Sequence, residues 1–285
     1  MKRILIAGKD SYIGSSLEAW LGRPEYAGRY QADTVDMRGE GWKSRDFSGY
    51  DTVFHVAGIA HRKETKQNAS LYYEVNRDLA IMAAEKAREE GVRQFILLSS
   101  MNVYGKTEGI ITKDSVPAPK TNYGRSKLEA DIAVRKMEKR DFKAAILRPP
   151  MVYGKGCKGN YPRLAKLARI MPVFPDVRNR RSMIYIENLC DFVEGIIRLE
   201  QRGIFHPQNK DYICTSDLMK KIAFCHGHKI IFVPGAGRLA KQAAGETGKK
   251  VFGTLIYDME EDRCARFGLE ESIMKTECQG SGGGR

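Results

Sequence analysis

The sequence predicts an α/β fold built on a doubly wound parallel sheet, because strand and helix patterns alternate along its first 150 residues. Short apolar runs predict buried strands at residues 3–8, 32–36, 51–57, 93–99 and 143–148. Helical periodicity falls between them, at residues 11–22, 69–91 and 122–140. We therefore expect one sheet with helices on both of its faces.

After Pro149 and Pro150 the alternation weakens, which predicts a smaller region of mixed α/β structure at residues 151–278. An extended piece is expected from Lys229 to Val233, and helical patterns occur at residues 161–170, 187–200, 215–226 and 236–245. Residues 279–285 have the composition of a linker, so we expect a flexible tail there.

The first predicted strand leads into a glycine-rich turn. Gly8, Ser11 and Gly14 hold the three positions of a Gly-x-x-Gly-x-x-Gly turn, with serine in place of the middle glycine. Such a turn brings backbone N–H groups at a helix N-terminus against a pyrophosphate. Asp36, 22 residues beyond Gly14, would accept hydrogen bonds from the adenosine ribose of NAD, whereas Arg38 would favour the extra phosphate of NADP. We expect a bound dinucleotide, with NAD favoured over NADP.

A Tyr-x-x-x-Lys pair, Tyr123 and Lys127, lies 23 residues after a strand that ends in Ser99 and Ser100. Residues four apart share one face of a helix, so Lys127 is expected near the foot of Tyr123. An ammonium there favours the phenolate and lowers the tyrosine pKa from its ordinary value of about 10. The pair, with a serine hydroxyl to orient a substrate, is typical of general acid/base chemistry.

Together these motifs resemble the extended short-chain dehydrogenases/reductases of the NAD-dependent nucleotide-sugar epimerase/dehydratase family. The resemblance spans roughly the first two thirds of the chain, in the segments ILIAG to YIG (4–14), VFHVAG (53–58), FILLSSMNVYG (95–105), YGRSK (123–127), LRPPMVYG (147–154) and RSMIYIENLCD (181–191). It implies a Rossmann-like dinucleotide-binding domain at residues 1–150 and a substrate-binding region at 151–278.

The resemblance also implies roles for individual residues. Ser100, Tyr123 and Lys127 would be catalytic, with Lys127 holding the nicotinamide ribose while Tyr123 moves a proton on a sugar hydroxyl or carbonyl. Ser100 and Arg181 would contact substrate, Arg181 through the diphosphate, with Asn160 and His61 as further candidates. The cofactor would contact Gly8, Ser11, Tyr12, Ile13, Gly14, Asp36, Arg38, Asp46, Phe47, Ala57, Gly58, Asn76, Ser99, Tyr123, Lys127, Pro149 and Val152.

Two residues after Ser100 bear on the reaction. The family's 4,6-dehydratases carry an Asp-Glu pair there as acid and base, but this chain has Met101 and Asn102. The resemblance then implies an NAD-dependent 4-epimerase of a UDP-hexose or UDP-N-acetylhexosamine, acting through a transient 4-keto sugar. The alternatives are an NAD(P)H-dependent reductase of a nucleotide 4-keto sugar, or a non-catalytic dinucleotide-binding sensor.

The composition, 42% hydrophobic and 29% charged residues, is that of a globular protein. No apolar run approaches the roughly 18 residues that span a membrane, and the N-terminus leads directly into a strand, so we expect a cytoplasmic protein. The net charge of +13 is spread along the chain, which argues against a nucleic-acid partner. Attraction to an anionic nucleotide sugar accounts for the charge, and association with an anionic membrane surface is left open.

The six cysteines lack paired spacing and are expected to be reduced thiols. Cys225, His226 and His228 are too close in sequence to converge readily on one ion, so we expect no metal site. By resemblance, the protein would form a homodimer through the helices at residues 69–91 and 122–140.

Overall fold

The structure, a computed structural model, describes residues 1–60, 62, 64–243 and 245–278. His61 and the expected tail at 279–285 lie outside these residues. The chain forms two compact units. The first comprises Met1–Gly105, Pro117–Pro149 and Cys190–Pro207, and the second comprises Lys106–Val116, Pro150–Leu189 and the described residues from Gln208 onward.

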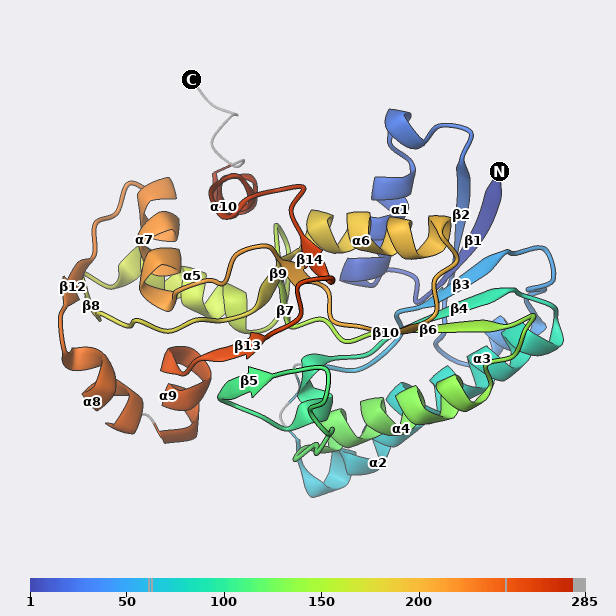
Figure 1. Ribbon diagram of the computed structural model, residues 1–285, viewed down its shortest axis with the longest axis horizontal. Helices are drawn as coiled ribbons and strands as arrows, with labels where there is room; N and C mark the ends of the chain where they lie inside the picture. Colours follow the sequence, from blue (N-terminus) through green and yellow to red (C-terminus); the bar gives the residue numbers. More distant parts are fainter. Residues whose placement is uncertain (61, 63, 244, 279–285) are drawn as a thin grey trace. The chain divides into compact units, whose positions relative to one another are not determined.

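The first unit is built on a six-stranded sheet with the order β10-β6-β4-β3-β1-β2 (Figure 1). Its strands are β1 (Lys2–Ala7), β2 (Tyr30–Val35), β3 (Thr52–His55), β4 (Gln94–Leu98), β6 (Lys143–Leu147) and β10 (Gly203–Phe205). All neighbouring strands are parallel, which confirms the predicted fold class. The strand order reverses between β1 and β3, and ligands of such sheets bind at the carboxyl ends of the strands beside this reversal.

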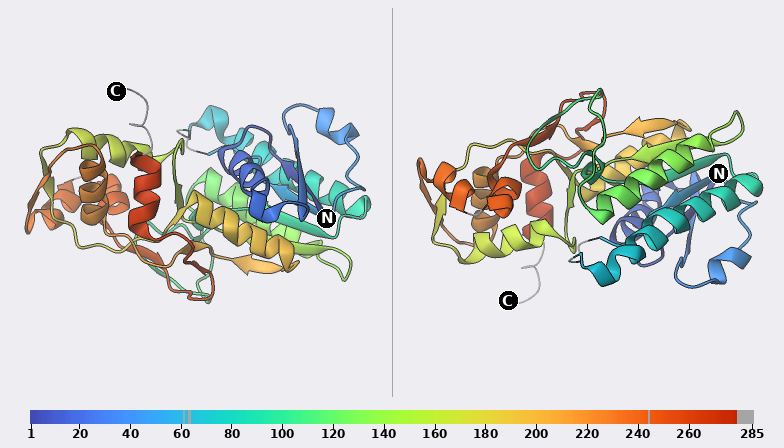
Figure 2. Two further views of the ribbon diagram at one scale, coloured as in Figure 1. Left: turned by 90° about the horizontal axis from the view of Figure 1, so that it is seen from above. Right: turned by 90° about the horizontal axis from the view of Figure 1, so that it is seen from below.

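Helices cover both faces of this sheet. On one face lie α1 (Tyr12–Leu21) and α6 (Ile186–Arg198), and on the other lie α3 (Leu79–Glu89) and α4 (Asn122–Lys136) (Figure 2). The predicted helix at 69–91 is present in three parts, since α2 (Ala69–Tyr73) continues into α3 through a π-helical segment, Glu74–Asp78. The α3 surface against the sheet is made of fully buried alanines, whose small side chains allow close packing: Ala80, Ala83, Ala84 and Ala87.

The described residues of the second unit form small parallel strand pairs and helices. The strand pairs are β5 (Gly109–Ile111) with β13 (Leu255–Tyr257), β7 (Met151–Tyr153) with β9 (Met183–Tyr185), β8 (Val173–Pro175) with β12 (Ile231–Val233), and β11 (Gln208–Asn209) with β14 (Arg263–Cys264). Its helices are α5 (Asn160–Ile170), α7 (Thr215–Cys225), α8 (Ala236–Ala243), α9 (Gly245–Phe252) and α10 (Leu269–Glu277). In the part of the chain that the structure describes, no helix has the length and hydropathy to cross a membrane.

A disulfide joins Cys225, at the end of α7, to Cys278, which follows α10. Their Cα atoms are 5.5 Å apart. The expectation of six reduced thiols is therefore wrong for these two residues, because sequence spacing cannot show that the ends of two helices meet. The neighbouring histidines have protein partners, since His226 pairs with Glu277 at 2.8 Å and His228 bonds the carbonyl of Met171 at 2.8 Å.

Candidate active site

The glycine turn lies where the sheet order reverses. Gly8 follows β1 with a φ of +140°, and a Cβ added there would lie 2.8 Å from Val56 Cγ2 and 2.9 Å from the Ala57 backbone nitrogen. A side chain at Gly14 would meet Ile6 at 3.0 Å. Only glycine fits these two positions, so bare backbone faces the carboxyl edge of the sheet.

Ser11, which replaces the middle glycine, holds the turn together. Its Oγ donates to the Gly8 carbonyl at 2.6 Å and accepts from the Gly14 N–H at 3.2 Å, as the N-cap of α1. Tyr12 and Ile13 begin that helix. Serine at this position is therefore compatible with the turn and stabilises the helix N-terminus where a pyrophosphate would bind.

Gly58 and Asn76 form a second glycine-dependent contact. A Cβ on Gly58 would lie 2.9 Å from Asn76 Oδ1 and 3.2 Å from Lys127 Nζ. Asn76 is fully buried in the π-helical segment, and its amide accepts from the Ile59 N–H at 2.8 Å and donates to the Ile59 carbonyl at 3.1 Å. Asn76 thus fixes the backbone that follows Ala57 and Gly58, consistent with a π-bulge at a functional site.

Ser100, Tyr123 and Lys127 belong to the same unit and meet near the end of β4. Lys127 is buried, and its ammonium donates to the Leu98 carbonyl at 2.9 Å. The Ser100 hydroxyl lies close enough to the Tyr123 phenol to affect its pKa. Ser100 also caps the short 3-10 helix Met101–Tyr104, where its Oγ accepts from the Asn102 N–H at 3.2 Å. Ser99 is buried beside it, with its N–H on the Leu147 carbonyl at 2.7 Å.

The electrostatics of the Tyr123–Lys127 pair differ from the sequence-based expectation. Burial raises the pKa of Tyr123 above its ordinary value, and the nearby Ser100 hydroxyl only partly opposes this. The expected lowering of this pKa is wrong for the protein alone, since the phenol pays a desolvation penalty on ionising. Burial lowers the pKa of Lys127 to about 8, against the influence of Asp131. His55, fully buried beside Lys127, has its pKa lowered to about 3 and is neutral at physiological pH.

A buried ionic network lies one helical turn beyond Lys127. Asp131 accepts from Arg148 Nε at 2.9 Å, and both side chains are buried. Arg148 Nη1 donates to the Tyr104 hydroxyl at 2.8 Å, and that hydroxyl lies 2.7 Å from His206 Nε2. This network was not predicted from the sequence. The spacing of Asp131, four residues after Lys127, was the available signal.

The role of Glu64 was not predicted from the sequence either. Its carboxylate accepts from the backbone N–H groups of Asn122 and Tyr123, both at 3.0 Å. Thr121 is the N-cap of α4, and its Oγ1 accepts from the Gly124 N–H at 3.1 Å. A carboxylate at a helix N-terminus is favoured by the helix dipole, so Glu64 fixes the turn that carries Tyr123.

The cofactor-selecting residues pair with each other. Arg38 donates to both carboxylate oxygens of Asp36, at 2.7 to 3.0 Å, and its backbone N–H bonds the same carboxylate. Arg38 holds the pKa of Asp36 near 2, so the carboxylate is ionised. Asp36 thus offers negative charge at the end of β2 while the guanidinium of Arg38 is already engaged, which favours a ribose hydroxyl over an extra phosphate.

The remaining expected contacts are distributed over both units. Asp46 accepts from the Ser48 N–H at 2.8 Å, whereas the Phe47 side chain is fully buried in the core, which leaves only its backbone to contact adenine. The carbonyl of Pro149 accepts from the Met101 N–H at 2.9 Å in the first unit. Val152 lies in β7 of the second unit.

Asn160 and Arg181 also belong to the second unit. Asn160 is the first residue of α5 and is exposed. Arg181 Nη1 donates to the Gly253 carbonyl at 2.8 Å, and burial lowers its pKa. A partly buried guanidinium that is bonded to a neutral carbonyl gains from an anionic ligand.

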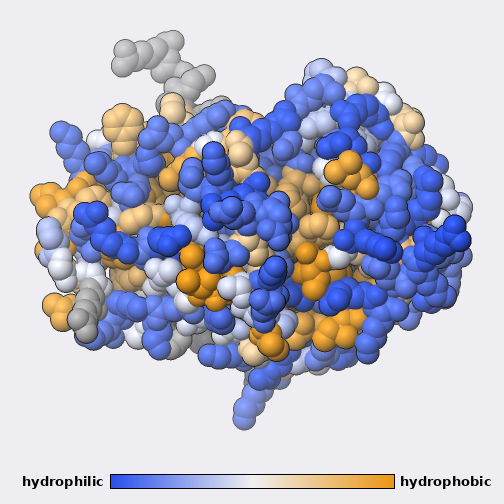
Figure 3. Space-filling view, in the orientation of Figure 1, coloured by the Kyte–Doolittle hydropathy of each residue, from blue (hydrophilic) through white to orange (hydrophobic). Residues whose placement is uncertain are grey.

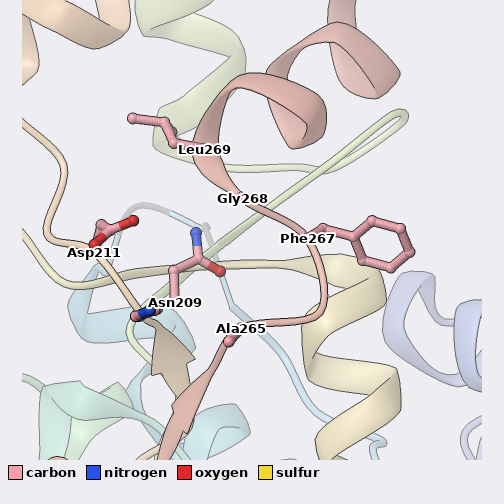
Figure 4. Close-up of a pocket in the computed structure, with 7 residues that line it drawn as sticks. Asn209, Asp211, Ala265, Phe267, Gly268 and Leu269 are labelled. Atoms are coloured by element: carbon pink, nitrogen blue, oxygen red, sulfur yellow. The ribbon is translucent and has the colours of Figure 1, made fainter.

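A small hollow elsewhere in the second unit is not a nucleotide site. Its volume is about 40 Å³, enough for water only, and Figure 4 shows the Phe267 ring directed away from Asp211 and Leu269. The Asn209 amide, at its edge, donates to the Tyr153 hydroxyl at 3.0 Å.

The residues of the first unit fit a dinucleotide, because Gly8, Gly14 and Gly58 keep the reversal point of the sheet free of side chains. With Tyr123 and Lys127 at the same sheet edge, they define an NAD(P)-dependent enzyme of the extended short-chain dehydrogenase/reductase type. Residues 4–206 match the NAD dependent epimerase/dehydratase family, and the chain belongs to that family.

Comparisons with individual proteins agree with this family assignment. The chain is 29% identical to the UDP-glucose 4-epimerase of Vibrio cholerae over 249 residues, which are 78% of this chain and 75% of that protein. It is 28% identical to the N-acetyl-alpha-D-glucosaminyl-diphospho-ditrans,octacis-undecaprenol 4-epimerase of Escherichia coli O157:H7 over 165 residues, 56% of this chain and 49% of that protein. The UDP-glucuronic acid 4-epimerase of Bacillus cereus, solved with NAD, has a TM-score of 0.73 at 17% identity, covering 96% of this chain and 97% of that one.

Proposed function

We propose that the protein is an NAD-dependent nucleotide-sugar 4-epimerase acting on a UDP-hexose or a UDP-N-acetylhexosamine. The observation that carries the proposal is the meeting of Tyr123, Ser100 and Lys127 at the carboxyl edge of the sheet, beside the glycine-lined reversal point. Met101 and Asn102 follow Ser100, so no acid/base pair for dehydration is present at those positions. The similarity to the Vibrio cholerae enzyme supports this choice of reaction.

Each residue has its own role in one cycle of oxidation and reduction at C4 of the sugar. NAD, when bound, would supply a hydride acceptor for oxidation at C4 and, in its reduced form, a hydride donor for the reduction that follows. Tyr123 takes the proton of the C4 hydroxyl and gives it back to the oxygen of the 4-keto sugar. Ser100 hydrogen-bonds the same oxygen, and Lys127 binds the nicotinamide ribose and stabilises the tyrosinate.

The substrate diphosphate is the proposed ligand of Arg181. Its guanidinium is partly withdrawn from water and donates to the Gly253 carbonyl, with Glu108 as the nearby charge, so the diphosphate would add negative charge that the guanidinium can bind. Asn160 is the proposed second contact, as an exposed amide at the start of α5. The proposed oligomer is a homodimer formed through α3 and α4.

The first experiment is mass spectrometry of the dinucleotide released when the purified protein is denatured. An epimerase returns its hydride in each cycle and retains NAD, so near-stoichiometric NAD is expected. Turnover of UDP-glucose, UDP-N-acetylglucosamine and a polyprenyl-diphosphate N-acetylglucosamine is then measured without added cofactor. An empty site that binds NADPH would instead indicate a 4-keto sugar reductase, and retained NAD without turnover of any sugar would indicate a sensor.

A further inference from the structure

The β8–β12 strand pair of the second unit has apolar side chains on both of its faces. Phe174 is buried and Phe232 is partly buried, as expected for the face that packs inward. The alternate residues Val173, Ile231 and Val233 point the other way and are exposed, Ile231 to 68%. A half-buried strand normally alternates apolar with polar residues, so this outward face is unusual for a surface exposed to water.

Helix α8 extends this surface. Leu239, 70% exposed, lies with Val233 and Val173 around an open hollow of about 410 Å³. The hollow is lined throughout by apolar residues, Val173, Phe174, Pro175, Val233, Ala236, Leu239 and Ala243. Figure 3 shows hydrophobic atoms gathered at the left edge of the molecule, where Figure 1 places β8 and β12. We call Val173, Ile231, Val233 and Leu239 the β8–β12 face.

The chain segment that supplies three residues of this face is basic. Residues 229–250, which contribute Ile231, Val233 and Leu239, contain five Lys and Arg residues and one Glu. Lys229, two residues before Ile231, and Lys250 in α9 are exposed. Lys241 forms an ion pair with Glu108. This segment therefore contributes a net charge of +4 to the chain's +13.

We infer that the β8–β12 face docks on a membrane surface that contains anionic phospholipids. The apolar side chains would enter the boundary between headgroups and acyl chains, and the surrounding lysines would contact lipid phosphates. Charge complementarity selects this occupant, since a second copy of the same face would bring like charges together. Nucleic acid phosphates would match the charge but would leave the apolar hollow in water.

The experiment is co-sedimentation of the full-length protein with vesicles, without substrate. Vesicles of phosphatidylcholine mixed with phosphatidylglycerol are compared with vesicles of phosphatidylcholine alone. Binding only to the anionic vesicles, weakened by salt, is expected. The double variant Ile231→Ser, Leu239→Ser should lower the partition coefficient at least about tenfold, because two apolar side chains lose their burial. Lys229→Gln and Lys250→Gln should each lower it about fivefold.

Matched controls come from the first unit. Leu199→Ser removes an exposed leucine and Lys136→Gln removes an exposed lysine, and neither should change vesicle binding. Thermal unfolding and dinucleotide content show that each variant is folded, and turnover of soluble substrate reports separately on the proposed function. Equal binding to both kinds of vesicle, or binding to neither, overturns the inference. A change of oligomeric state in the double variant, or binding of a single-stranded oligonucleotide in place of vesicles, overturns it equally.

Discussion

Tyr123 is the residue on which the proposed proton transfer depends. Its phenol interacts with Ser100, and burial raises its pKa in the protein alone, so proton uptake from the C4 hydroxyl requires the stabilisation of the tyrosinate that we propose for Lys127. Tyr123→Phe removes only the hydroxyl, and we expect turnover to fall about 10²- to 10⁴-fold while NAD is still retained. The measurement is steady-state turnover together with dinucleotide content.

The neighbouring Tyr72 is the matched control. Its ring packs edge-on against Tyr123 with centroids 6.5 Å apart, but its hydroxyl donates to the Arg62 carbonyl. Tyr72→Phe should therefore retain most of the activity. Equal losses in the two variants would show that packing, rather than the Tyr123 hydroxyl, explains the effect.

Lys127 should leave a signature in the pH dependence of stability. Its pKa is lowered to about 8 in the folded protein, against an ordinary value of 10.5. Below pH 8 the ammonium is charged in both states and its burial opposes folding. As pH rises from 8 towards 10.5 the folded protein loses the proton first, so the unfolded state binds more protons and stability increases.

The free energy of unfolding by urea is compared between the wild type and Lys127→Met, from about pH 7 to about pH 10. Relative to the variant, the wild type should gain about 2 kcal/mol over this range. Parallel stability curves would show that the ammonium of Lys127 is well solvated in the folded protein.

At the scale of elements, the start of α4 is fixed by Glu64. The carboxylate accepts two backbone N–H groups, one of them from Tyr123 itself. Glu64→Ala should lower the free energy of unfolding by about 1 kcal/mol and should also lower turnover, because the turn that carries Tyr123 loses a partner. Thr121→Ala removes the other cap of the same helix, at Gly124. It should cost similar stability with a smaller effect on turnover, and the reverse order would contradict the positioning role of Glu64.

The Asp131–Arg148 pair ties α4 to the end of β6. Both side chains are buried, so removing one charge leaves the other without compensation. Asp131→Asn should destabilise the protein by about 3 kcal/mol or more in urea unfolding. The double variant Asp131→Asn, Arg148→Met should be less destabilised than the sum of the single variants. Additive losses would show that the two groups do not interact energetically.

The elements that the sequence predicted well are those with complete patterns. Five strands of the sheet and helices α1, α3 and α4 each contain enough residues to show their periodicity. Strand β10, Gly203–Phe205, has three residues and pairs with β6 across more than 50 intervening positions, so only tertiary pairing defines it. Helices α9 and α10 were missed in the same C-terminal region, where short elements interrupt one another.

The site residues divide in the same way, into those that a local sequence pattern marks and those that only the packed structure brings together. Gly8, Gly14, Tyr123 and Lys127 were found because local spacing carries their chemistry. Glu64 acts on a helix 58 residues away, and no sequence pattern marks that contact. The pKa of Tyr123 was predicted in the wrong direction, because the burial of its phenol is a property of the packed structure.

At the scale of the whole molecule, the proposed homodimer can be tested on the outer surfaces of α3 and α4. These helices pack together and each exposes a large apolar side chain, Met82 and Ile132. A pairing of both helices with those of a second copy would bury the two side chains. We expect a dimer by light scattering, and a monomer for the double variant Met82→Glu, Ile132→Glu, because four buried carboxylates would face one another in the dimer. Met274→Glu, at a more exposed apolar site in α10, should remain dimeric. A wild type that is monomeric at all concentrations would overturn the dimer, whereas a monomeric double variant that retains NAD would show that each first unit binds its cofactor alone.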